Sequence, residues 1–149
     1  MAQDSADPFV QKLGYTKGIG AKLVSYNRNH QWKSTAEEWW TLVNGENNFI
    51  KLEESYVTEI GYHDLAANHI HHVTGYFHAP ISGMYTFSCT VDDIMIVKMS
   101  KFRNSANKDN LFTLLKHEKW TGSRFNPYLR KDEIHAVRQQ HLSEGLYYF

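Results

Sequence analysis

The sequence contains a single cysteine among 149 residues, Cys89. No disulfide can therefore form within the chain, and its fold must depend on a packed core, for which this length is sufficient. Cys89 shares a face with the apolar residues Phe87 and Val91 of a strand-like segment and has no basic residue beside it. This context predicts a buried small hydrophobic side chain rather than a reactive thiol.

Net charge and long apolar runs are also lacking. Sixteen basic and sixteen acidic residues give a formal net charge of zero, so we expect no nucleic-acid partner. No apolar stretch approaches the roughly 20 residues that span a bilayer, so we expect no direct membrane insertion. The first ten residues lack the basic and apolar parts of a signal peptide, and no Asn-x-Ser/Thr sequon occurs. These absences favour a chain that is not secreted, or a piece of a longer one.

Common catalytic motifs are absent as well. The chain has no Gly-rich phosphate loop, no G-x-S-x-G and no C-x-x-C. Asp92 and Asp93 are adjacent, and neighbouring side chains of a strand point apart, unlike the facing carboxylates of glycosidases. We therefore expect no enzyme of these classes.

Short strand-like segments make up most of what is present. Residues 84–91 alternate apolar and polar side chains, with Tyr85, Phe87 and Cys89 on one side. A second apolar strand, residues 94–99, follows the two aspartates. Many short strands separated by Gly and Pro turns predict an all-β fold, an antiparallel β-sandwich, with residues 75–99 as its central hairpin.

One short helix and the domain limits complete the predicted organisation. Overlapping capping boxes at Ser34 and Thr35 start a helix over residues 35–43, and Asn44-Gly45 predicts a left-handed stop. Residues 1–14 read as an N-terminal tether, and residues 15–149 as one domain. Within it we expect a first strand at 18–26, a polar connection at 46–55 and a last strand at 141–149.

Nine histidines suggest an alternative function. His69 and His71 alternate along a predicted strand and so share a face, which suits a zinc, copper or iron site. His63, Asp64 or His78 would supply a third ligand. The alternative reading is therefore a His-dependent metal enzyme that uses His69 and His71.

Two separate motifs point to a family. One reads G-Y-F-H-A-P-I-S-G-M-Y-T-F from Gly75 to Phe87 and continues into Asp92-Asp93; the other reads H-L-S-E-G-L-Y-Y and ends at Tyr148. Their order and spacing resemble the protective-antigen-type (PA-14) domain, and among its members the fibrocystin-like surface proteins.

The resemblance implies a non-catalytic β-sandwich module of the kind found in toxins, glycosidases, adhesins and ciliary or cell-surface proteins. In the sugar-binding adhesins two aspartates bind calcium, which then accepts sugar hydroxyls as ligands, because a hard cation prefers oxygen donors. Asp92 and Asp93 match those two positions. The resemblance therefore implies calcium as cofactor and a glycan as ligand.

Two features depart from the family pattern. The sequence stops at Phe149, where the family adds at least one more strand, so we expect the domain to lack its last strand or to complete its sheet with a partner chain. Tyr147 and Phe149 would then lie at the partner interface. Ile94 and Ile96 place apolar groups on a face that is usually polar, which indicates a protein interface or burial under a loop or the helix.

Together these observations lead to one functional expectation. The chain is expected to be a binding and assembly module of a larger protein or complex that is extracellular, luminal or at the cell surface, including the ciliary surface. Its ligand would be a glycan or a neighbouring protein.

Overall fold

The computed structural model describes residues 21–28, 32–45, 49–57, 69–89, 91, 94–104, 110–118 and 134–149. Their elements, in chain order, are β1 (Ala21–Asn27), α2 (Ala36–Asn44), β2 (Ile50–Val57), β3 (His69–Thr74), β4 (Tyr76–Ala79), β5 (Gly83–Cys89), β6 (Met95–Ser100), β7 (Leu111–His117), β8 (Ala136–Leu142) and β9 (Gly145–Tyr148). Every strand pair is antiparallel. The predicted all-β class is confirmed, while the sandwich arrangement stays a prediction. The predicted tether, residues 1–14, lies outside the described residues.

The strand pairing differs from the predicted central hairpin. The ladders are β2–β1–β3, β4–β9, β5–β8 and β6–β7. Within the described strands, β4, β5 and β6 each pair with a later strand and not with one another, so the hairpin prediction was wrong. A hairpin needs a tight turn that returns the chain alongside itself. Here the connections lead the chain from one ladder to another.

Strand β2 occupies part of the segment that the sequence analysis assigned to a polar connection. That prediction was wrong because β2 is an edge strand, exposed along most of its length, where charged residues do not interrupt pairing. Glu54 of β2 forms ion pairs with Lys51 and with Lys22 of β1. Hydrogen bonds from Lys51 and Lys22 lower the pKa of Glu54 to about 2.

Helix α2 confirms the prediction of one short capped helix. Thr35 is its N-cap: the Thr35 Oγ1 accepts a hydrogen bond from the Glu38 N–H at 3.2 Å. The predicted left-handed stop was wrong, because Gly45 is extended, with φ of −105°. Instead, the side-chain amide of Asn44 donates to the Trp40 carbonyl at 3.0 Å, which satisfies a carbonyl of the last turn without a left-handed residue.

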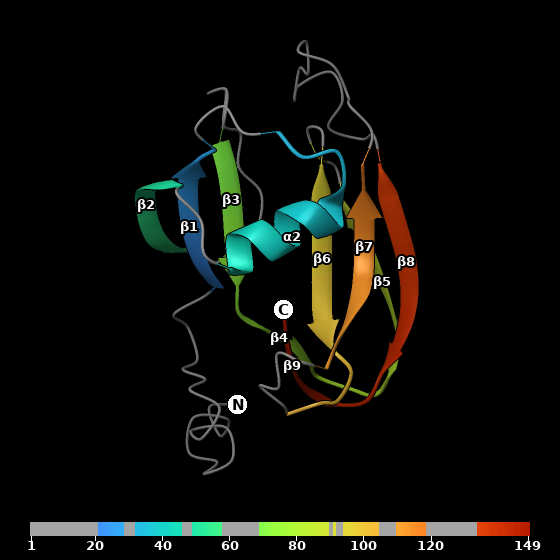
Figure 1. Cartoon of the computed structure of the whole chain (residues 1–149). Helices are drawn as coiled ribbons and strands as arrows, with labels where there is room; N and C mark the ends of the chain where they lie inside the picture. Colours follow the sequence, from blue (N-terminus) through green and yellow to red (C-terminus); the bar gives the residue numbers. More distant parts are fainter. Residues whose placement is uncertain are drawn as a thin grey trace.

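The helix lies against β6 (Figure 1). Lys98 of β6 forms an ion pair with Glu37 of the helix at 3.0 Å, and its ammonium group lies 4.9 Å from the centre of the Trp40 ring. The N–H of Ala36, at the helix start, donates to the Glu118 carboxylate at 2.8 Å. These contacts fix the N-terminal half of the helix against β6 and the end of β7.

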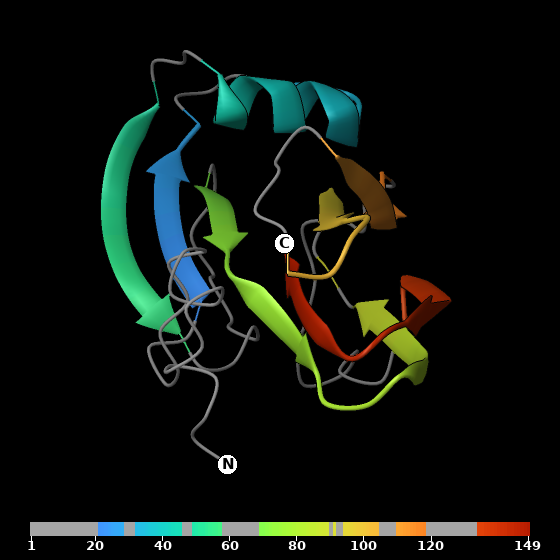
Figure 2. The ribbon, with the colours of Figure 1, turned by 90° about the horizontal axis from the view of Figure 1, so that it is seen from below.

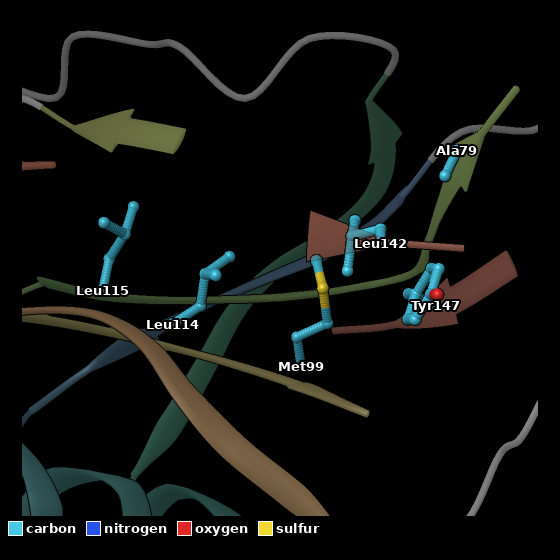
Figure 3. Packing of buried hydrophobic residues seen from close by; sticks show 6 residues of the cluster. All are labelled: Ala79, Met99, Leu114, Leu115, Leu142 and Tyr147. Atoms are coloured by element: carbon cyan, nitrogen blue, oxygen red, sulfur yellow. The ribbon is translucent and has the colours of Figure 1, made fainter. Parts of the chain in front are cut away.

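The core lies among β4 to β9. Figure 3 shows its buried residues: Ala79, Met99, Leu114, Leu115, Leu142 and Tyr147. Tyr85, Phe87 and Cys89 of β5 pack against this cluster, whereas Thr86 and Ser88 are exposed. The alternation predicted for this strand is therefore confirmed.

The two sequence motifs meet in one ladder. Strand β3 runs through Gly75 into β4, as Figure 2 shows. β4 pairs with β9, so that Phe77 lies opposite Tyr147. Gly75 then exchanges two backbone hydrogen bonds with Phe149, at 3.0 and 2.9 Å. Residues far apart in the sequence thus form one structural unit.

The last predicted strand, residues 141–149, is in fact two strands. β8 ends at Leu142 and β9 begins at Gly145, which has a φ of +150°. A Cβ on Gly145 would lie 3.0 Å from the Arg103 Cβ, so space as well as conformation requires glycine here. The single-strand prediction was wrong because the turn at Gly145 interrupts the apolar pattern.

Candidate functional site

Asp92 and Asp93 lie outside the described residues, but the structure describes Val91 and Ile94 on either side of them. The N–H of Val91 donates to the Nδ1 atom of His135 at 2.9 Å. The N–H of His135 in turn donates to the Cys89 carbonyl at 2.8 Å, which extends the β5–β8 ladder by one residue. His135 therefore holds the chain that leads into the aspartate pair.

A second histidine pairs with the strand that follows the aspartates in the sequence. β6 begins at Met95, whose partner in the β6–β7 ladder is His117. The imidazole rings of His117 and His135 are stacked, with centroids 4.8 Å apart and planes 20° apart. The β5–β8 and β6–β7 ladders, whose strands β5 and β6 precede and follow the aspartates in the sequence, thus meet through these two rings.

A cavity of about 450 Å³ adjoins the stacked rings. The described residues that line it are Lys116, His117, Glu118 and His135. Glu118 Oε1 lies 3.8 Å from the Lys116 Nζ and also accepts the Ala36 N–H. The sequence analysis did not predict this cavity, because its residues come from two separate segments, the end of β7 and the start of β8. The only signal that relates them is that both segments lie at strand ends.

His69 and His71, the alternative metal pair, share a face of β3. Their ring centroids are 6.2 Å apart, and the Nδ1 atom of His71 lies 2.9 Å from the buried hydroxyl of Ser25. Among the described residues no group of three His, Cys, Asp or Glu side chains is placed to hold a metal ion. Of the third ligands considered, His63 and Asp64 lie outside the described chain, and His78 is exposed on β4.

The four residues predicted at a partner interface lie in different surroundings. Ile94 and Ile96 are partly buried, and Ile96 lies two residues before Lys98, which contacts α2. Tyr147 is buried in the core cluster. Phe149 is partly buried and pairs through its backbone with Gly75.

Comparisons with protein-family models, with curated proteins and with solved structures find no match. The likeness to the protective-antigen-type domain therefore rests on the sequence motifs.

The surroundings of Cys89 and the length of the helix also bear on function. Cys89 is half buried against the core, and burial raises the pKa of its thiol, which keeps the thiol in its less reactive protonated form. In the described part of the chain, no helix is long and apolar enough to cross a membrane.

Proposed function

We propose that this chain is a non-catalytic binding and assembly module of the protective-antigen type. It would act within a larger extracellular or cell-surface protein or complex and recognise a glycan or a neighbouring protein. The observation that carries the proposal is the pair of sequence motifs from Gly75 to Phe87 and from His141 to Tyr148.

The described fold supports this proposal in one specific way. Tyr76–Ala79, near the start of the first motif, and Gly145–Tyr148, at the end of the second, pair with each other as β4 and β9. The two motifs depend on each other structurally, because each strand supplies the hydrogen-bond partners of the other.

Within the proposal, Asp92 and Asp93 bind calcium, and calcium then binds the ligand. Two adjacent carboxylates at a bend supply the oxygen donors that calcium prefers. The two aspartates directly follow Val91 in the sequence, and the Val91 N–H donates to His135.

A protein ligand is the second class within the proposal. Among the described strands β2 pairs only with β1, and it exposes Ile50 and Tyr56 by 57% and 60%. An exposed edge of this kind can accept a strand from another chain.

Calcium-dependent thermal stability tests the proposal. A ligand that binds only the folded state raises the melting temperature, and at 100 times its Kd it stabilises by about 2.7 kcal/mol. We expect calcium to raise the melting temperature of the wild-type chain, and Asp93→Asn to abolish that shift. Glu53→Gln, on the exposed strand β2, is the control and should retain it.

Two outcomes would contradict the calcium part of the proposal. One is a melting temperature that does not change with calcium. The other is a shift that Asp93→Asn leaves intact, because calcium would then bind elsewhere.

With calcium bound, a panel of neutral and acidic sugars identifies the glycan class.

A further inference from the structure

The turns that follow β4, β6 and β8 lie at one end of the core ladders, the lower end in Figure 1. The backbone of Glu144, in the turn between β8 and β9, connects the other two turns. Its N–H donates to the Ser82 hydroxyl at 2.9 Å, and its carbonyl accepts a hydrogen bond from the Arg103 guanidinium at 2.9 Å. We refer to residues 80–83, 101–104 and 143–144 together as the three-turn end.

Large apolar side chains are exposed at the three-turn end. Ile81, in the turn after β4, is 70% exposed, and Phe102, in the turn after β6, is 63% exposed. Met84, the second residue of β5, is 64% exposed beside the first of these turns. One exposed apolar side chain is common on a protein surface, but a group of them at one end indicates an interaction site.

Hydrogen bonds hold both turns in shape, so that the apolar side chains stay outside the core. The Tyr85 hydroxyl bonds to the carbonyl and to the N–H of Ile81, at 2.6 and 3.4 Å. In the turn after β6, Asn104 has a left-handed φ of 53°. Its N–H donates to the Leu146 carbonyl at 2.6 Å, and its side-chain oxygen accepts the Leu146 N–H at 3.0 Å. A turn that is already ordered loses little conformational entropy when it binds.

Basic residues flank the apolar tip of the turn after β6. Lys101 and Arg103 lie on either side of Phe102 in the sequence, and both are exposed. Glu144 is the one acidic residue of the three-turn end, so basic residues outnumber acidic ones there by two to one. An apolar side chain between two basic ones suits the surface of a bilayer with anionic lipids, because long basic side chains reach the phosphates while the apolar group enters below them.

The size of this surface favours a bilayer over a protein partner. A stable protein interface uses roughly 20–30 residues on each side, whereas the three-turn end offers a few apolar side chains on separate elements. A bilayer is fluid and can surround separate tips. Contact of this kind lies at the lipid surface and needs no membrane-spanning segment.

We propose that the three-turn end docks onto the surface of a bilayer that contains anionic lipids. Ile81 and Phe102 enter the interfacial region, with Met84 at the edge of the contact, and Lys101 and Arg103 contact lipid phosphates. This inference goes beyond the proposed function and does not rest on it, because it uses neither calcium nor the aspartate pair. β5 ends and β6 begins at the opposite end of the ladders (Figure 1).

Co-sedimentation of the whole chain with lipid vesicles, in EDTA, tests the proposal. One set of vesicles contains phosphatidylcholine alone, and the other contains equal amounts of phosphatidylcholine and phosphatidylserine. We expect the chain to bind the vesicles with phosphatidylserine about fivefold more strongly or better, because the three-turn end has one basic residue in excess. Added salt should reduce this preference, because it screens exposed charges.

Substitution of the apolar tips locates the contact. Phe102→Ser and Ile81→Ser should each lower the vesicle partition coefficient about tenfold, because less apolar area leaves water on binding. Both side chains are exposed, so neither change removes a core contact. Ile134→Ser is the matched control: Ile134 is 60% exposed and precedes β8, whose start lies at the opposite end of the ladders. This variant should bind like the wild type.

Two charge variants should act in opposite directions on vesicles with phosphatidylserine. Lys101→Gln removes a positive charge and should weaken binding about fivefold, whereas Glu144→Gln removes the negative charge and should strengthen it about fivefold. Glu144→Gln keeps the backbone N–H and carbonyl that bond to Ser82 and Arg103. The arrangement of the turns is therefore preserved while the charge changes.

Four results would overturn the proposal. They are the absence of binding to both vesicle types, equal binding to the two, wild-type binding by both Phe102→Ser and Ile81→Ser, and a loss in Ile134→Ser as large as theirs. Charge variants that shift binding in the same direction would also contradict it. Because calcium is absent throughout, none of these results bears on the Asp92–Asp93 proposal.

Discussion

At the scale of single residues, two tyrosine hydroxyl groups explain why both motifs contain Gly-x-Tyr. The hydroxyl of Tyr147 donates to the Ser143 carbonyl at 2.9 Å and accepts the Ser143 N–H at 3.0 Å. The hydroxyl of Tyr85 makes the same two bonds to Ile81, at 2.6 and 3.4 Å. Each tyrosine therefore closes the turn that precedes its own strand.

Removal of these hydroxyl groups should destabilise the fold to different extents. Tyr147 is buried, so Tyr147→Phe leaves two backbone groups without their partner and should lower the free energy of unfolding by about 1–3 kcal/mol. Tyr85→Phe should cost about 1 kcal/mol or less, because Ile81 is exposed and water can replace the hydroxyl. Urea denaturation of both variants measures the difference. Equal losses, or no loss in Tyr147→Phe, would show that these bonds do not stabilise the turns.

The sequence predicted single residues well where the cause is local. The inward direction of Phe87 and the partial burial of Cys89 follow from alternation along one strand. The contact between His117 and His135 could not be predicted in this way. It requires the β6–β7 and β5–β8 ladders to end side by side. The residue pattern within one segment does not indicate which ladders are neighbours.

At the scale of elements, the start of α2 distinguishes two overlapping capping boxes. The sequence offered Ser34 and Thr35 as caps, and the structure uses Thr35, whose Oγ1 accepts the Glu38 N–H. Ser34 only donates to the Glu38 carboxylate, at 3.4 Å and at an exposed position. The two hydroxyl groups should therefore contribute unequally to stability.

Alanine substitution at the two positions tests this assignment. Thr35→Ala removes the N-cap and should lower the free energy of unfolding by about 1 kcal/mol. Ser34→Ala, its matched control, should change it by no more than about 0.5 kcal/mol. Thermal or urea unfolding of both variants gives the comparison. A larger loss in Ser34→Ala would make Ser34 the cap.

The helix and strand β5 followed from the sequence, but strand β2, the division between β8 and β9, and the strand partners did not. The helix and β5 have strong local signals, caps in one and period two in the other. Strand β2 has no such alternation, because neither of its faces is fully covered. The pairing of β4 with β9 depends on packing between segments far apart in the chain. The aspartate pair, the best site that the sequence suggested, lies outside the described residues, so its assignment still depends on the motif.

At the scale of the whole molecule, the three-stranded sheet β2–β1–β3 is distinct from the core. The core cluster draws its buried residues from β4, β6, β7, β8 and β9 and none from β1 to β3. Leu23 and Val24 of β1 are buried but lie outside that cluster. Gly75, between β3 and β4, links the two parts, because it pairs with Phe149 on the core side.

Gly75 also lies too close to β1 to accept a side chain without movement. A Cβ at this position would lie 3.1 Å from the Ala21 Cβ and 3.3 Å from the Phe149 ring. Gly75→Ala should therefore push β1 and Phe149 outward and weaken the link between the sheet and the core. Regions with fewer buried apolar contacts open at lower free energy than the core does.

Hydrogen exchange measured by mass spectrometry tests this division. In the wild-type chain we expect the amides of β1 and β2 to exchange faster than those of β5 to β8. In Gly75→Ala the protection of β1 and β3 should fall by about tenfold or more, since a loss of 1.4 kcal/mol in opening free energy corresponds to a factor of ten, while β5 to β8 change little. Gly83→Ala is the matched control, because a Cβ at Gly83 meets no atom within 4 Å. Uniform loss of protection in Gly75→Ala would instead mean that the sheet and the core unfold as one cooperative unit. In that case, a ligand that binds either part would stabilise both.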